Sequence, residues 1–283
     1  MTYSERLLLC RKEKTAVLAT NFYNVETLFG ILRAAKECEK PVILQTSPST
    51  LSYLGIDMAI NIAKTAITEY GVEAYLHLDH AKDSKLVKTC IDKGFDSVMI
   101  DASEDKYEVN KRITREIVNY AHHRGVFVEA ELGFVPKLGQ ESFGVDGYTD
   151  PIQAEDFAYE TGVDFLAVSI GTAHGFYKKK PRLDLKRLEQ IADRVSIPLV
   201  LHGGSGLTPK QWRETIIRGI TKINFATEIK NTFMNSIRIE MNKSKDIDLR
   251  TVFPVGIKSV KHLVRDKIII CSKKNNKKVG ARK

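Results

Sequence analysis

Eight short apolar segments alternate with longer segments of helical character along most of the chain. The apolar segments comprise residues 16–19, 42–44, 74–78, 97–100, 126–128, 165–168, 198–201 and 222–224. The predicted helices comprise residues 25–39, 58–70, 84–94, 109–124, 151–162, a segment after Asp184 that ends near Arg194, 209–218, and a helix that begins near Thr227. Continuous apolar strands are typical of a parallel sheet buried on both faces. Eight strand–helix units in about 250 residues predict a (β/α)8 TIM barrel, and a doubly wound sheet is the alternative.

No low-complexity linker or shift in composition divides the chain of 283 residues. A length of this order suits one large domain. We therefore expect residues 1–271 to form a single catalytic domain. Its last part, Ser244 to Cys271, is predicted to be an additional C-terminal helix packed on the barrel. Residues 272–283 are predicted to be a basic, disordered tail.

The positive charge of the chain is concentrated in that tail. The net charge is +9, and the tail contributes six positive charges and no acid, so the rest of the chain carries only +3. A charged tail without interleaved aromatic residues does not favour a nucleic-acid partner. Part of the remaining charge suits a phosphorylated substrate.

Three further observations concern location. The chain has no run of about 18 apolar residues, so no membrane span is expected. The first fifteen residues are charged and lack the apolar stretch of a secretory signal. The four cysteines lie far apart and form no Cys-x-x-Cys pair. A cytoplasmic protein with reduced thiols is the expectation.

Two imidazoles and a carboxylate lie within four residues at the end of the third apolar segment. Alternation along a strand would place His77 and Asp79 on one face and His80 on the other. If the strand ends at Asp79, His80 can turn in beside the carboxylate. We interpret His77 as a hydrogen-bonded histidine of the core.

Histidines follow three different predicted strands. His80 follows the third, His174 the sixth and His202 the seventh. Chemistry in a barrel takes place at the carboxyl ends of its strands, so these side chains are expected to meet. Three neutral imidazoles with an open position are the ligand set of a catalytic zinc site.

Glycines follow the seventh predicted strand in the segment Gly203 to Gly206, shortly before a helix that begins at Pro209. Small residues let backbone N–H groups approach an oxyanion, and a helix N-terminus favours negative charge. Barrels often bind phosphate after their seventh and eighth strands, where residues 224–227 form the neighbouring helix entry. The pattern predicts a phosphorylated substrate.

Together these motifs resemble those of the class II, metal-dependent ketose-bisphosphate aldolases, with the tagatose branch somewhat closer than the fructose branch. The similar segments are residues 75–81 (YLHLDHA), 128–133 (VEAELG), 171–175 (GTAHG), 201–206 (LHGGSG) and 222–228 (KINFATE). The likeness covers almost the whole chain and fades in the basic tail.

The resemblance implies a lyase that splits a ketose 1,6-bisphosphate into dihydroxyacetone phosphate and glyceraldehyde 3-phosphate, or forms it from them. His80, His174 and His202 would hold Zn²⁺, with Glu131 as a carboxylate close to the metal. Asp79 would carry the hydroxyl proton. The residues implied in substrate binding are Asn21, Ser47, Gly175, Gly203, Gly204, Ser205, Asn224, Phe225, Ala226 and Thr227. The family also implies a homodimer or homotetramer and an assisting monovalent cation, Na⁺ or K⁺.

Two positions depart from what the resemblance implies. Fructose-specific relatives often carry an acidic residue where this chain has Ala226. The loop after Gly133, which supplies a second base in relatives, is shorter than in the tagatose branch and contains Pro136, which fixes φ. We expect Glu141 to be that base, with Asp146 as its competitor.

Two other functions remain open at this point. One is an aldolase for another phosphorylated ketose or keto acid. The other is a barrel kept as a non-catalytic binding subunit, against which an intact Asp79 and three histidines argue.

Overall fold

The computed structural model describes residues 1–136, 147–177 and 179–274. Eight parallel strands form a closed barrel in chain order, and β8 pairs with β1. The strands are β1 (Val17–Asn21), β2 (Val42–Thr46), β3 (Ala74–Ala81), β4 (Ser97–Ile100), β5 (Phe127–Leu132), β6 (Phe165–Val168), β7 (Leu199–Leu201) and β8 (Ile220–Phe225). The predicted (β/α)8 barrel is confirmed.

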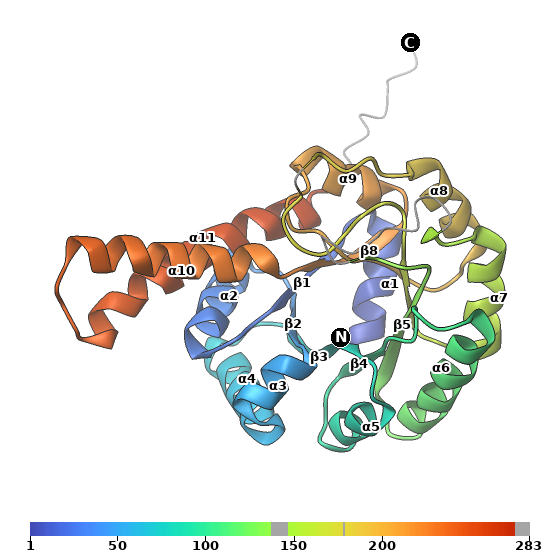
Figure 1. Cartoon of the computed structure of the whole chain (residues 1–283), viewed down its shortest axis with the longest axis horizontal. Helices are drawn as coiled ribbons and strands as arrows, with labels where there is room; N and C mark the ends of the chain where they lie inside the picture. Colours follow the sequence, from blue (N-terminus) through green and yellow to red (C-terminus); the bar gives the residue numbers. More distant parts are fainter. Residues whose placement is uncertain (137–146, 178, 275–283) are drawn as a thin grey trace, which may run out of the picture.

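Helices α2 to α9 are arranged around the strands (Figure 1). The helices are α1 (Tyr3–Glu13), α2 (Val25–Cys38), α3 (Pro48–Leu54), α4 (Ile56–Tyr70), α5 (Ser84–Asp92), α6 (Tyr107–His122), α7 (Pro151–Thr161), α8 (Leu185–Arg194), α9 (Pro209–Ile217), α10 (Thr227–Lys243) and α11 (Leu249–Ser272). Local signals fix where several of them begin. At α9, for example, Thr208 and Gln211 form a capping box, and Pro209 occupies the first turn.

The sequence pattern did not predict α1 or the short helix α3. In α1 the leucines at positions 7, 8 and 9 are consecutive, so they do not show the spacing of an amphipathic helix. The structure nevertheless buries Tyr3, Leu7 and Cys10 of α1 in a cluster with inward-facing strand residues such as Val17 and Phe165. Helix α1 therefore contributes to the core inside the barrel.

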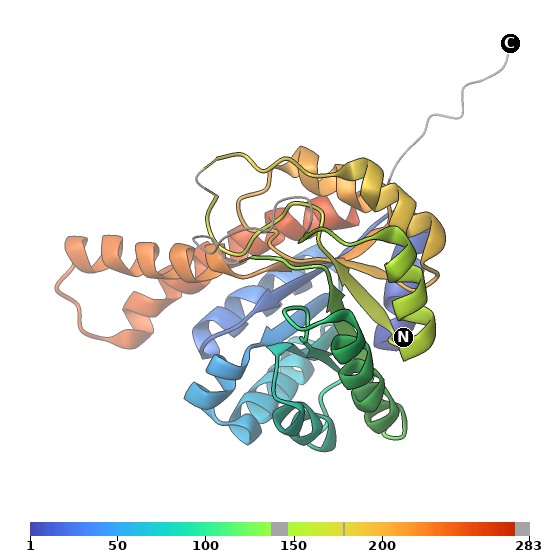
Figure 2. The ribbon, with the colours of Figure 1, turned by 45° about the vertical axis from the view of Figure 1, so that its right-hand side comes forward.

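The C-terminal helices form a hairpin that projects from the barrel in both views (Figures 1 and 2). Helix α11 begins five residues later than the predicted segment. Its middle part packs on α2, where a Cβ atom at Gly30 would lie 2.7 Å from the Val260 side chain. The outer part does not pack on the barrel as expected, and it leaves apolar side chains exposed. These are Met234, Ile239, Met241, Ile247 and Leu249.

Within the described part of the chain, no helix has the length and apolar character needed to cross a bilayer.

Candidate active site at the carboxyl ends of the strands

A bulge in β3 turns His80 toward the barrel mouth. The strand does not end at Asp79, as one reading of the sequence assumed, but continues to Ala81. Leu78 pairs with Val98 and Ala81 with Ile100, so two residues of β3 lie opposite one residue of β4. His80 occupies this bulge with φ at 48°, in the left-handed region. The side chains of Asp79 and His80 therefore both face the barrel mouth, although regular alternation along a strand would place them on opposite faces of the sheet.

The three predicted histidines meet at the barrel mouth. One possible ligand atom from each of His80, His174 and His202 lies within 4.8 Å of the others. The ring of His80 stands nearly perpendicular to both neighbours, with centroid distances of 4.8 Å to His174 and 4.4 Å to His202. They come from β3 and from the loops after β6 and β7, which are far apart in the sequence.

Two carboxylates fix the orientation of two of these rings. Nδ1 of His80 donates to Oδ2 of Asp101 over 2.7 Å. Nε2 of His202 donates to Oε1 of Glu129 over 2.9 Å. Such partners orient an imidazole and raise its strength as a metal ligand. Nε2 of His80 and Nδ1 of His202 are then the nitrogens that face the triad.

Those two nitrogens lie 2.6 Å apart, so a proton must lie between their lone pairs. Burial acts to lower the pKa of His80, but surrounding carboxylates, Asp79 foremost, raise it to about 9. Burial and the neighbouring His80 lower the pKa of His202 well below its usual value. In this contact Nε2–H of His80 donates to Nδ1 of His202. The residues fit a divalent cation, because three imidazoles converge and two have carboxylate partners.

Glu131 lies beside the triad on the inner face of β5. Its Oε2 is 3.8 Å from Nδ1 of His202 and has no hydrogen-bond partner, while Oε1 accepts from the Val135 amide over 3.1 Å. Burial, reinforced by the charge of Asp101, raises the pKa of Glu131 to about 8. A cation in the triad would give this unpaired oxygen a partner.

Asp79 is held by amide groups from three other strands. Its Oδ2 accepts from Nδ2 of Asn21 over 3.0 Å. Its Oδ1 accepts from Nδ2 of Asn224 over 3.1 Å and from Nε2 of Gln45 over 3.3 Å. The residue is only 7% exposed, and these three contacts hold its carboxylate in place.

Sequence reasoning missed Asp101, Gln45 and the role of Glu129. Asp101 directly follows β4, the one strand end to which no role was assigned, so its position was a usable signal. Gln45 directly follows the second predicted strand, but β2 extends to Thr46 and includes it. Glu129 directly follows the fifth predicted strand, residues 126–128, but β5 extends to Leu132 and places Glu129 in the barrel interior.

Backbone crowding at the β7 loop requires glycine. A Cβ atom at Gly203, where φ is 71°, would lie 2.5 Å from the carbonyl oxygen of Ala173. At Gly204 it would lie 2.7 Å from that of Asn224. The hydroxyl of Tyr177 links the same loops, since it accepts from the Ala173 amide over 2.8 Å and donates to the Gly203 carbonyl over 2.9 Å. These contacts hold the loops that carry His174 and His202 together.

The remaining predicted residues lie at the same end of the barrel. Helix α10 begins at Thr227, and its N-cap residue, Ala226, provides no side-chain hydrogen bond to the first N–H groups. Ser205 is buried, and Gly175 has φ at 109°. The Ser47 side chain caps α3.

Phe225 cannot contact a substrate through its ring, which packs on Trp212 of α9 and leaves only the backbone near the mouth. Glu141 and Asp146 lie outside the described residues.

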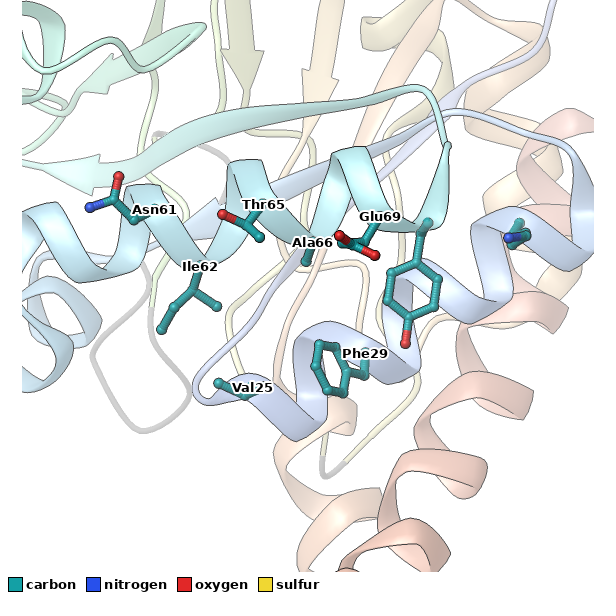
Figure 3. A pocket seen from close by; sticks show the side chains of 9 residues that line it. Val25, Phe29, Asn61, Ile62, Thr65, Ala66 and Glu69 are labelled. Carbon is teal, nitrogen blue, oxygen red and sulfur yellow. The ribbon is translucent and has the colours of Figure 1, made fainter.

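A hollow of about 650 Å³ lies elsewhere, on the outer surface between α2 and α4 (Figure 3). It is lined by apolar side chains such as Phe29 and Ile62, and it contains one carboxylate, Glu69. It shares no residue with the histidine site.

A closed barrel with three converging imidazoles at its mouth is the arrangement of a metal-dependent barrel enzyme. The family profile described as fructose-bisphosphate aldolase class-II matches residues 1–276. The chain therefore belongs to the class II fructose-bisphosphate aldolase family, whose members are lyases that act on phosphorylated sugars and are generally metal-dependent.

Solved structures agree with this family. The YdjI aldolase of Escherichia coli K12 is 28% identical, with a TM-score of 0.84 over 97% of this chain and 98% of that one. A Coccidioides immitis protein provisionally assigned as a fructose-1,6-biphosphate aldolase is 30% identical, with a TM-score of 0.86 over 94% of each chain. Fructose-bisphosphate aldolase (Fba) of Campylobacter jejuni is 23% identical, with a TM-score of 0.82 over 96% of this chain and 94% of that one, and supports the fold alone.

Proposed function

We propose that the protein is a zinc-dependent aldolase that cleaves or forms a ketose 1,6-bisphosphate. The observation that carries the proposal is the convergence of His80, His174 and His202 beside Asp79 at the barrel mouth. Three imidazoles with an open position suit Zn²⁺. The bound ion would supply Lewis acidity toward the oxygens on which negative charge develops.

Asp79 is the proposed proton carrier. In cleavage it takes the proton of the substrate hydroxyl, and in condensation it returns that proton to the aldehyde oxygen. The amides of Asn21, Gln45 and Asn224 orient it, so the carboxylate needs no rearrangement before transfer. Removal of the carbon-bound proton of dihydroxyacetone phosphate requires a second base. Glu141 remains our proposal for that base.

A phosphate group is proposed to bind between the β7 loop and the start of α10. The uncapped N–H groups at the α10 N-terminus and the small residues Gly203 and Gly204 support this assignment. Glu131 is proposed to act near the metal, and Na⁺ or K⁺ to be an assisting cation.

A coupled assay on fructose 1,6-bisphosphate and tagatose 1,6-bisphosphate tests the function. The two sugars differ only at the C4 hydroxyl, so discrimination depends on groups near that atom. Ala226, at the start of α10, offers no side-chain hydrogen bond where fructose-specific relatives often have an acid. A missing partner weakens discrimination by about 1–3 kcal/mol. We expect kcat/KM for tagatose bisphosphate at least equal to that for fructose bisphosphate.

The variant Ala226→Asp should move this ratio toward fructose bisphosphate. Ala226→Asn, which has the same shape without the charge, is the matched control. Strict fructose specificity of the wild type would contradict the prediction. Turnover of neither sugar, with metal bound, would favour another phosphorylated substrate or a binding role.

The projecting hairpin supports a homo-oligomer. Ile247 and Leu249 near its tip are 92% and 62% exposed. Burying such a side chain contributes about 1.5–3 kcal/mol. The double variant Ile247→Asp/Leu249→Asp should therefore raise the dissociation constant of a dimer or tetramer by about a hundredfold or more.

Light scattering across a dilution series measures this change. Tyr159→Asp, at an equally exposed site on α7, should leave the oligomer intact. A monomeric wild type, or a hairpin variant that associates as well as the wild type, would contradict the prediction.

A further inference from the structure

A fully buried lysine lies beneath the histidine triad and has no part in the proposed chemistry. Lys222 is the third residue of β8, and its side chain has no exposure to solvent. Alternation along β8 places it on the same inner face as Asn224, one step deeper in the barrel. Lysine is almost never fully buried unless it is paired. Its partners therefore decide what it does.

The Lys222 ammonium has two acceptors inside the barrel. Its Nζ lies 2.6 Å from Oε2 of Glu129 and 3.3 Å from Nε2 of His77. An ammonium can only donate, so Nε2 of His77 accepts, and Nδ1–H of His77 donates to Oγ of Ser97 over 3.0 Å. Burial and Lys222 together lower the pKa of His77 well below its usual value. His77 is thus a neutral core histidine, as the sequence indicated, and an anchor for the lysine.

Glu129 connects the lysine to the metal site. One carboxylate oxygen accepts from Lys222 and the other accepts from Nε2 of His202, over 2.9 Å. Both Glu129 and Lys222 have no exposed side-chain surface. An isolated carboxylate in such a place would be strongly unfavourable, whereas a paired and hydrogen-bonded one is tolerated. Without the Lys222 ammonium, the Glu129 carboxylate that orients His202 would be a buried charge with no counter-charge.

We propose that Lys222 is a positioning residue for the metal centre. Its positive charge compensates the Glu129 carboxylate and holds it against Nε2 of His202, so that Nδ1 of His202 carries the lone pair that faces the triad. The inference rests on the proposed function, because it assigns Lys222 to the support of a metal ligand. It does not place Lys222 in contact with the substrate.

Metal affinity and fold stability, measured on three variants, test the proposal. The variants are Lys222→Met, Glu129→Gln and the combined Lys222→Met/Glu129→Gln. Co²⁺ is the probe, its dissociation constant is measured by chelator competition, and its visible absorption spectrum reports ligand geometry. Thermal unfolding of the metal-free protein reports the fold. Loss of a partner that orients a metal ligand weakens metal binding about 10–100-fold.

We expect both single variants to bind Co²⁺ at least tenfold more weakly, with an altered spectrum. The combined variant removes both charges, so its metal-free form should regain most of the lost thermal stability while Co²⁺ affinity stays at least tenfold weaker. The control Arg6→Met removes a half-buried ion pair with Glu73, outside the site, and should lower stability without changing Co²⁺ affinity or spectrum.

Three outcomes would overturn the proposal. Wild-type affinity and spectrum in Lys222→Met would show that the lysine supports only the fold. Wild-type Co²⁺ affinity in the combined variant would show that Lys222 and Glu129 together support only the fold. This measurement still decides the question if Lys222→Met alone does not fold. A wild type that binds no Co²⁺ would instead overturn the metal assignment, and the inference with it.

Discussion

Replacing His174 by alanine should abolish both metal binding and aldol cleavage. The site has three imidazoles, and His174 is one of them, with its possible ligand atom within 4.8 Å of those of His80 and His202. Loss of one ligand in three should lower metal affinity severely, because the remaining two cannot hold the ion at a defined position. Chelation of the wild type should likewise remove activity, and added Zn²⁺ should restore it.

Bound zinc and turnover are measured on the same preparation. His262→Ala is the matched control, since His262 is exposed on α11, and it should retain both. Full activity of metal-free enzyme would contradict the mechanism. So would a lysine adduct with the substrate that borohydride traps, since it would indicate an amine in place of a metal.

The variant Asp79→Ala should keep its zinc and lose turnover by roughly a hundredfold or more. The carboxylate accepts hydrogen bonds from three side-chain amides, and Asp79 is not one of the three residues whose ligand atoms converge, so its removal should leave the ligand set in place. Asp79→Asn, which keeps the shape and removes the proton-accepting function, should lose a similar factor. Loss of zinc in either variant would identify Asp79 as a ligand or as a support of one.

Long-range periodicity made the fold predictable. Eight apolar segments correspond to eight strands, and strand ends located His80, His174 and His202 because all carboxyl ends of a parallel barrel lie together. The conformation of His80 was not predictable in this way. Its positive φ arises from a bulge that depends on pairing between β3 and β4. A positive φ is uncommon for residues other than glycine, so the sequence gives no reason to expect one at a histidine.

The support of the site was harder to predict than its centre. Glu129 and Lys222 lie inside strands, where a charged residue in an apolar run carries no sign of its partner. Their contact joins residues 93 positions apart, and a local sequence pattern cannot predict a pair at that separation. Asp101 could have been found, because the strand-end rule that located the histidines also applies to β4. Helix α1 was missed because its burial is set by the barrel interior rather than by its own spacing.

Closure of the barrel between β1 and β8 has a consequence for how the protein is made. During synthesis, β1 leaves the ribosome roughly 200 residues before the strand that completes its pairing. Helix α2 is likewise made long before α11, which packs on it. The buried residues of α1 are made long before their partners in β6 and β7. Until then the nascent chain exposes an unpaired strand edge and an uncovered apolar helix face, both of which invite aggregation. A stop in translation between residues 201 and 220 would leave every strand but β8 made, and the sheet still open.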